Sequence, residues 1–328
     1  MKKNTLLLVV SALTLSVTAQ APVKRYVTIE HFTNSRCGIC ASRNPAFYTT
    51  IDPYATDVHH VSIHPPVPYT NCVFYQANTT ENSALAGVYG IQGTPRVALN
   101  GTLIPAGNPL LPAATFQQYL NQTSPLYVQV VETTGSTRDV TIRLRTQDAI
   151  PAGNYKLYAL IAEKEINLTT PNGEKVHHDV FRQMLTPVAG VDYTPAALGQ
   201  EVVFNYNYTL NSGWQPNETF VTAYVRNTAT GEILNSGTRF DPIILNAGEQ
   251  TIGAVTLTPN PANAVTFAQL GDDTAQNIEV FDSAGRRVSL QQGADNPVSI
   301  RLDGLEPGLY FVRILGEKGL YVAKVVKE

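Results

Sequence analysis

Two of the three cysteines in this 328-residue chain stand three positions apart, within the segment NSRCGICASRNP at residues 34–45. If a helix begins here, Cys37 and Cys40 lie one turn apart on one face, where two sulfurs can approach disulfide distance. The partial positive charge of a helix N-terminus favours a thiolate at Cys37, and Arg36 adds a cation beside it. The spacing predicts a redox pair in which Cys37 attacks and Cys40 resolves. A structural disulfide and a pair of metal ligands fit the same spacing.

The composition sets the class of protein. Hydrophobic residues make up 43% of the chain and charged residues 15%, so real hydrophobic cores are possible. A net charge of −3 provides no basic stripe, and we expect no nucleic-acid partner. The length exceeds one average domain and predicts two or three. No residue pattern calls for a cofactor, and we expect no resident metal.

The N-terminus has the pattern of a signal peptide over residues 1–21. Lys2 and Lys3 precede a largely apolar run at 6–17, and small residues at 19–21 suit a cleavage site. This run is too short to cross a bilayer core of about 30 Å. No later run is long and apolar enough, so we expect no transmembrane segment. The mature protein is expected in a compartment where disulfides persist.

The rest of the sequence divides into three segments. Residues 22–124 alternate strand-like and helix-like patterns and predict a small α/β domain. Residues 125–248 change to a period of two and predict a β-sandwich. Residues 251–328 predict a smaller, Ig-like β-sandwich. Within the first segment the expected elements are a strand at 26–32, a helix at 37–50, a strand at 58–63, a hairpin at 96–104 around Asn100-Gly101, and an amphipathic helix carrying Phe116, Tyr119 and Leu120.

The stretch YGIQGTPRVALNG at residues 89–101 resembles the part of the thioredoxin family that carries a cis-proline. Pro95 then corresponds to the cis-proline, and Thr94 to the neighbour whose backbone meets an extended substrate. Phe32 and Pro45 stand at the family's spacings on either side of the cysteine pair. The resemblance implies a thioredoxin-like fold for the α/β domain and exchange with protein thiols or disulfides as substrates.

Three positions depart from the thioredoxin pattern. Arg36 replaces a tryptophan, and with Thr94 it is assigned to substrate binding. His31 replaces the buried acid that assists proton transfer at the resolving cysteine in the family. Since imidazole titrates near neutrality, His31 is a candidate catalytic residue, and a histidine that only fills its strand face is the alternative. The dipeptide between the cysteines, Gly38-Ile39, leaves the redox potential open.

The third cysteine, Cys72, lies in an insertion that includes residues 64–78. An odd cysteine in an exported protein can form a mixed disulfide with Cys37, pair between chains, or remain a buried thiol beside Phe74. A zinc site that joins Cys72 and His64 to the cysteine pair is a further alternative, in which the cis-proline has no role. No Ser–His–Asp order, phosphate loop or paired carboxylates stand out, so nothing favours a hydrolase.

Residues 160–185, together with the segments at 32–40 and 64–69, resemble the 28-kDa outer-membrane-protein family of Bacteroidetes. That family joins a thioredoxin-like domain to a β-sandwich. The resemblance covers residues 23–248 and implies a surface location without a settled activity.

The tail resembles a type A C-terminal sorting domain of type IX secretion. The matching segments are LTPNPANAVTF from Leu257, EVFDSAGRRV from Glu279, LDGLEPGLYFVRI from Leu302, and the terminal KVVKE. Their Pro, Asn and Gly residues are turn formers between short strands. The resemblance implies that residues 251–328 engage the type IX machinery. It further implies export through the periplasm to the medium or to the outer-membrane surface.

Two functions remain open at this point. The first is a surface or secreted thiol–disulfide oxidoreductase. The second is a non-catalytic binding or adhesion protein in which Cys37 and Cys40 form a permanent staple. Closing so short a loop removes little entropy from the unfolded chain, which weakens a purely structural motive. The exposure of Cys37 separates the two: an open groove beside Pro95 favours exchange, and burial favours the staple.

Overall fold

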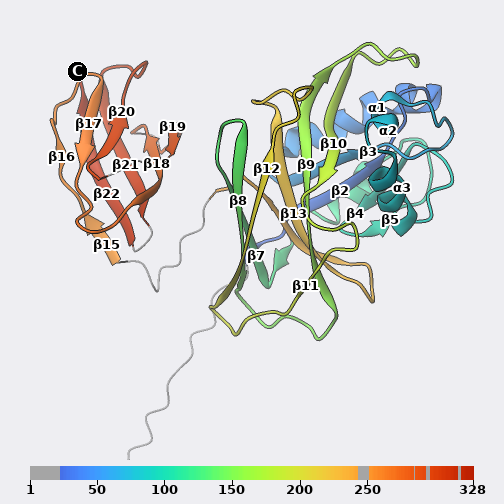
Figure 1. Ribbon diagram of the computed structural model, residues 1–328, viewed down its shortest axis with the longest axis horizontal. Helices are drawn as coiled ribbons and strands as arrows, with labels where there is room; N and C mark the ends of the chain where they lie inside the picture. The colour runs from blue at the N-terminus through green and yellow to red at the C-terminus, as the bar shows by residue number, and fades with distance from the viewer. Residues whose placement is uncertain (1–22, 243–250, 284, 293–295, 317–318) are drawn as a thin grey trace, which may run out of the picture. The chain divides into compact units, whose positions relative to one another are not determined.

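The computed structural model describes residues 23–242, 251–283, 285–292, 296–316 and 319–328. The predicted signal peptide lies outside these ranges. The chain divides into two compact units, the first ending at Asp241 and the second spanning Pro242–Glu328. Strands dominate both units, as the sequence predicts (Figure 1).

The first unit contains every helix of the described chain. These are α1 (Gly38–Ile51), the 3-10 turn η1 (Asp52–Tyr54), α2 (Val73–Ala77), α3 (Thr79–Val88) and α4 (Ala113–Gln117). Its strands are β1 (Val23–Lys24), β2 (Val27–Phe32), β3 (Val58–Ile63), β4 (Arg96–Leu99), β5 (Thr102–Leu103), β6 (Thr123–Ser124), β7 (Leu126–Glu132), β8 (Thr137–Thr146), β9 (Tyr155–Asn167), β10 (Val176–Met184), β11 (Val191–Tyr193), β12 (Glu201–Thr209), β13 (Thr219–Asn227) and β14 (Ile233–Thr238).

One long sheet runs through the first unit in the order β14-β13-β9-β10-β3-β2-β4-β5, with β11 paired to β9. β2 and β3 are parallel, β4 is antiparallel to β2, and β10 joins β3 through the parallel pair Val180 and Ser62. Strands from residues 22–124 and from 125–248 therefore belong to the same sheet. The boundary between these two segments as separate domains stays a prediction.

Strand β9 is buried on both faces from Tyr155 to Glu163. Leu157 and Ile161 pack into the core beneath the three-stranded sheet β12-β8-β7. Tyr158 and Leu160 point the other way, into a core shared with α3 and β3. Because side chains alternate along a strand, a continuous apolar run here means that layers cover both sides.

The local structure that the sequence predicts around α1 and β4 is present. Helix α1 begins directly after Cys37 and contains Pro45, and its Phe47 packs with Ile29 of β2. Asn100 and Gly101 have φ of 45° and 86°, as the expected hairpin turn requires. The Thr94–Pro95 peptide is cis, as expected. Helix α4 is shorter than expected, since Tyr119 and Leu120 follow its end, yet both pack against the same core.

The second unit has two sheets, β15-β22-β21-β18-β19 and β16-β17-β20. Ile278, Val312 and Ile300 are among the side chains of its common core. The strands are β15 (Thr251–Ala254), β16 (Leu257–Thr258), β17 (Val265–Ala268), β18 (Ala275–Phe281), β19 (Arg287–Gln292), β20 (Val298–Arg301), β21 (Gly308–Gly316) and β22 (Gly319–Lys327).

A buried ion pair joins β2 to β13. Arg226 Nη2 donates to Glu30 Oε2 at 3.0 Å, and both side chains are almost fully buried. The hydroxyl of Tyr89 donates to the same carboxylate oxygen, and that of Tyr224 lies 3.5 Å from the other. Burial raises the pKa of Glu30, and the positive charge of Arg226 opposes that rise. The pair links residues almost two hundred positions apart.

Removing the cation should destabilise the first unit in a pH-dependent way. Arg226→Met leaves Glu30 buried without a counter-charge, and we expect a loss of about 3–5 kcal/mol in the free energy of unfolding. The folded-state pKa of Glu30 then rises further above its unfolded value. The folded variant keeps a proton that the unfolded chain releases, so its stability falls as the pH rises from 5 to 8.

Urea unfolding at both pH values measures this effect. The double variant E30Q/R226M is the control and should lose the added pH dependence. An R226M protein as stable as the wild type at pH 8 would contradict the assignment.

Candidate functional site

The cysteine pair lies at the N-terminus of α1, next to the residue before Pro95. Cys37 is the N-cap residue, and its Sγ accepts a hydrogen bond from the Cys40 amide at 3.3 Å. Cys37 Sγ lies 3.6 Å from the Thr94 carbonyl oxygen, and Cys40 Sγ lies 3.3 Å from Thr94 Oγ1. Both thiols are free. Four of the predicted site residues thus meet in one place: Cys37, Cys40, Thr94 and Pro95.

The two sulfurs differ in their surroundings. Cys37 is 4% exposed and Cys40 is fully buried, although Ile39 between them is 54% exposed. Burial raises the pKa of Cys40 to about 12, and its hydrogen bond with Cys37 acts in the same direction. The Thr94 and Thr33 hydroxyls oppose that rise. Cys40 is therefore held as a thiol at neutral pH, as a resolving partner or a structural cysteine would be.

Sequence reasoning missed the residues that the β9–β10 hairpin brings to this site. Figure 1 shows the hairpin tip extending beyond the sheet toward α1. Asn172 Nδ2 lies 3.3 Å from the carbonyl oxygens of both Asn34 and Cys37. Glu174 Oε1 accepts a hydrogen bond from Asn44 Nδ2 of α1 at 2.7 Å. A Pro-Asn-Gly turn was readable in the sequence, but its contact partner, more than 130 residues away, was not.

Arg36 is exposed and points to the insertion. Its Nε donates to the carbonyl oxygen of Asn71 at 3.0 Å. The neighbouring Asn34 side chain donates to the Tyr69 carbonyl oxygen at 3.0 Å. Arg36 therefore helps to hold the insertion against the loop before α1, and its assignment to substrate binding stays a prediction.

His31 is fully buried between β2 and α1. Its ring lies 4.5 Å from that of Phe47 and 5.6 Å from that of His60, measured between centroids. Burial lowers the pKa of His31 well below its ordinary value, nearby His60 and His64 add to this, and Asn44 opposes it. His31 is thus neutral near pH 7, and its role in proton transfer at Cys40 stays a prediction.

Cys72 is fully buried, with Phe74 and Val180 around it. The amide and hydroxyl of Ser35 approach Cys72 Sγ at 3.4 and 3.2 Å. This is the arrangement of the buried-thiol alternative. The ring of His64 lies at a tilt against that of Phe74, with 4.7 Å between ring centroids. Among the residues that the structure describes, no group of three or more His, Cys, Asp or Glu side chains could hold a metal ion.

A Ser–His–Asp constellation, also missed in the sequence, lies elsewhere in the first unit. His59 Nδ1 is 2.8 Å from Ser236 Oγ, and His59 Nε2 is 2.9 Å from Asp241 Oδ1. Ser236 is fully buried, and its hydroxyl also accepts a hydrogen bond from Thr28. A serine without solvent access cannot attack a substrate, so this group serves to fasten β14 to β2 and β3.

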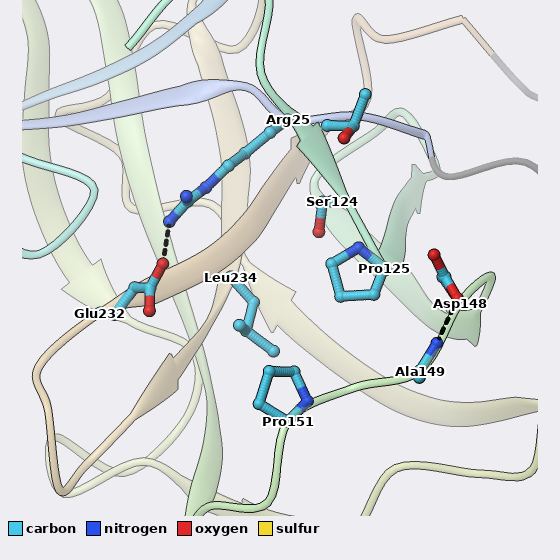
Figure 2. Close-up of a pocket in the computed structure, with 9 residues that line it drawn as sticks. Arg25, Ser124, Pro125, Asp148, Ala149, Pro151, Glu232 and Leu234 are labelled. Atoms are coloured by element: carbon cyan, nitrogen blue, oxygen red, sulfur yellow. Dashed lines mark hydrogen bonds and ion pairs between the residues drawn. The ribbon is translucent and has the colours of Figure 1, made fainter. Parts of the chain in front are cut away.

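A surface pocket of about 330 Å³ offers a different kind of site (Figure 2). Arg25 Nη2 and Glu232 Oε1 pair across one wall at 2.9 Å, so their charges largely neutralise each other. The remaining lining holds no cysteine or histidine and includes Ser124, Pro125, Asp148, Pro151 and Leu234. The cysteine pair is the stronger candidate for chemistry.

Comparison with known proteins settles the second unit. Residues 256–328 match the family described as the secretion system C-terminal sorting domain. The second unit is a type IX sorting domain. The predicted sorting domain is thereby confirmed, together with a secreted or cell-surface location and the type IX machinery as a partner. Within the described ranges, no helix is long and apolar enough to cross a membrane.

The solved structures that are similar to this chain include the following three. HBP35 of Porphyromonas gingivalis has 20% sequence identity and a TM-score of 0.57, over 93% of this chain and 98% of that one. Protein AGR_C_4864 from Agrobacterium tumefaciens has 15% identity and a TM-score of 0.39, over 70% and 100%. A domain of the outer membrane lipoprotein Omp28 from Porphyromonas gingivalis has 14% identity and a TM-score of 0.27, over 37% and 92%. No curated protein matches the chain. At this identity, the HBP35 likeness speaks for the fold alone.

The burial of the cysteines predicts selective alkylation. In the reduced, folded protein at pH 8, iodoacetamide should label Cys37 first and leave Cys40 and Cys72 at least about a hundredfold slower. Cys40 is almost entirely a thiol at this pH, and Cys72 has no solvent access. Peptide mass spectrometry over time measures the three rates. In urea the rates should converge, and equal rates in the folded protein would contradict the geometry.

The sorting domain predicts the fate of a shortened chain. A chain ending at residue 250 should accumulate in the periplasm, because it lacks the unit that the type IX machinery handles. Immunoblots of periplasm, outer membrane and medium measure its distribution against the full-length chain. Equal amounts of both chains outside the cell would contradict this assignment.

Proposed function

We propose that this protein carries out thiol–disulfide exchange outside the outer membrane, with residues 22–124 as a thioredoxin-like domain. One observation carries the proposal: the free thiols of Cys37 and Cys40 lie together at a helix N-terminus, and both contact Thr94, directly before Pro95. Substrates are proteins with accessible thiols or disulfides.

The exchange proceeds through a mixed disulfide. The Cys37 thiolate attacks one sulfur of a substrate disulfide, the substrate S–S bond breaks, and one substrate sulfur leaves as a thiolate. Cys40 then loses its proton and attacks the Cys37 sulfur, so that the Cys37–Cys40 disulfide forms and the second substrate thiolate leaves. Two electrons pass to the substrate. One substrate thiolate takes up the proton that Cys40 loses, and the other takes up a proton from water. In the reverse direction a substrate dithiol is oxidised.

The contacts fit these roles. The Cys40 amide points at the Cys37 sulfur, where a backbone N–H stabilises negative charge. The Thr94 hydroxyl lies against Cys40 Sγ and can donate to it when Cys40 becomes the leaving group. The Thr94 carbonyl beside Cys37 belongs to backbone that a substrate strand would follow. Arg36 and His31 keep their predicted parts in substrate binding and proton transfer.

The burial of Cys37 favours a second candidate. With only 4% of the residue exposed, the pair also suits a structural disulfide in a surface binding or adhesion protein. The β-rich part of the first unit would then make the contacts with the partner. The redox potential separates the two functions, because catalysts and structural disulfides occupy different ranges.

The decisive experiment equilibrates the mature protein, with Cys72 changed to Ser, in glutathione buffers. We expect a reduction potential for the Cys37–Cys40 pair between about −120 and −270 mV, the range of exchange catalysts. A potential below about −300 mV, typical of structural disulfides, would overturn the enzymatic proposal. Cys37→Ser and Cys40→Ser are the matched controls. The first should abolish exchange with a model disulfide, and the second should trap a mixed disulfide.

A further inference from the structure

We propose that Asn172 and Thr170, at the tip of the β9–β10 hairpin, are positioning residues for Cys37. The inference rests on the exchange chemistry proposed above and adds that the redox site is composite. The cysteine pair comes from the first segment of the chain, and the support for its N-cap comes from the second.

Asn172 binds the turn that precedes α1 at three points. Its Nδ2 approaches the carbonyl oxygens of Asn34 and Cys37 at 3.3 Å each, and its amide N–H donates to the Ser35 carbonyl oxygen at 3.2 Å. The turn itself is closed by a hydrogen bond from the Cys37 amide to the Asn34 carbonyl oxygen at 2.9 Å. One side chain from outside the segment therefore connects both ends of the turn that carries Cys37.

The Asn172 amide has a fixed orientation. Thr170 Oγ1 donates to Asn172 Oδ1 at 2.7 Å, and the Glu174 amide donates to the same oxygen at 3.2 Å. Asn172 Nδ2 also donates to Glu174 Oε2 at 2.5 Å. The oxygen is thus occupied by donors of the hairpin. One Nδ2 hydrogen is taken by Glu174 Oε2, and the other faces the turn, where the Asn34 and Cys37 carbonyl oxygens share it. Thr170 is buried and so is well placed to fix this orientation.

The turn geometry matters for the Cys37 sulfur. Cys37 has the extended backbone of an N-cap, with φ of −81° and ψ of 110°, and in this conformation its Sγ accepts a hydrogen bond from the Cys40 amide. Its carbonyl oxygen also accepts the first helical hydrogen bond, from Ala41 at 3.2 Å. If the hydrogen bonds of Asn172 are lost, the N-cap conformation of Cys37 becomes less populated. The Cys37 thiolate then spends less time within hydrogen-bond distance of the Cys40 amide.

Other charged and titratable groups stand on the elements that carry or adjoin the pair. From the preceding loop and α1 they are Arg36 and Arg43, from β2 His31, from the insertion Cys72, and from the hairpin Glu174 and His177. The variants chosen for the test are neutral and replace none of these groups. A change in reactivity then reports on geometry rather than on added or removed charge.

The experiment measures the rate of Cys37 alkylation by iodoacetamide between pH 5 and 9 in the reduced, full mature chain. The variants are Asn172→Ala and Thr170→Val. The matched control is Asn167→Ala on the same hairpin, whose side chain donates to the exposed Glu165. We expect both variants to react about threefold to tenfold more slowly at pH 7, as for the loss of one ordinary hydrogen bond. Their pH midpoints should rise, and the control should match the wild type.

Two results would overturn the proposal. In one, Asn172→Ala follows the Asn167→Ala control. In the other, Asn172→Ala reacts faster than the wild type, which would mean that the tip covers Cys37 rather than positions it. Thermal unfolding checks that each variant is folded, and Thr170→Val decides the matter if Asn172→Ala does not fold. Alkylation needs no protein substrate. If the wild type fails the exchange assay, the proposed function is overturned, but the effect of Asn172 on the reactivity of Cys37 can still be measured.

Discussion

The ion pair between Glu30 and Arg226 is the constraint on which the first unit depends. A carboxylate and a guanidinium removed from water must stay together, because either one alone is costly to bury. Their pairing fixes β13 over the face of β2 that points away from α1. Two further hydrogen bonds join the same two segments of the chain. The Thr28 hydroxyl donates to Ser236, and the Tyr26 amide donates to Asn235. The strands of the second segment are thereby held against the first.

This arrangement makes the long sheet a shared support for the cysteine pair. β10 continues the sheet beside β3, and the hairpin that β10 forms with β9 extends to the N-terminus of α1. The cysteine pair and the turn that contains Asn172 thus belong to the same compact unit. A cysteine motif of modest specificity gains a defined environment from strands that follow it by more than a hundred residues.

Short-range signals in the sequence were reliable and long-range contacts were not. The start of α1 after Cys37 and the Asn100-Gly101 turn each depend on backbone preferences of a few residues, whereas the cis peptide before Pro95 was expected from the resemblance to the thioredoxin family. The Asn172 contacts depend on how the second segment folds over the first, which no periodicity encodes. His31 gives a second example. Its place on a strand could be predicted from the sequence, but its deep burial could not, because that burial depends on the packing of α1 against the strand.

The cluster of His59, Ser236 and Asp241 has a consequence for export. Asp241 stands at the very end of the first unit, and its carboxylate also accepts the Thr238 amide at 2.7 Å. The C-terminal end of β14 is therefore held by hydrogen bonds to His59 and to the Thr238 amide. A protease that cuts the chain after Asp241 would leave these contacts intact, so the first unit should keep its last strand once the sorting domain is removed.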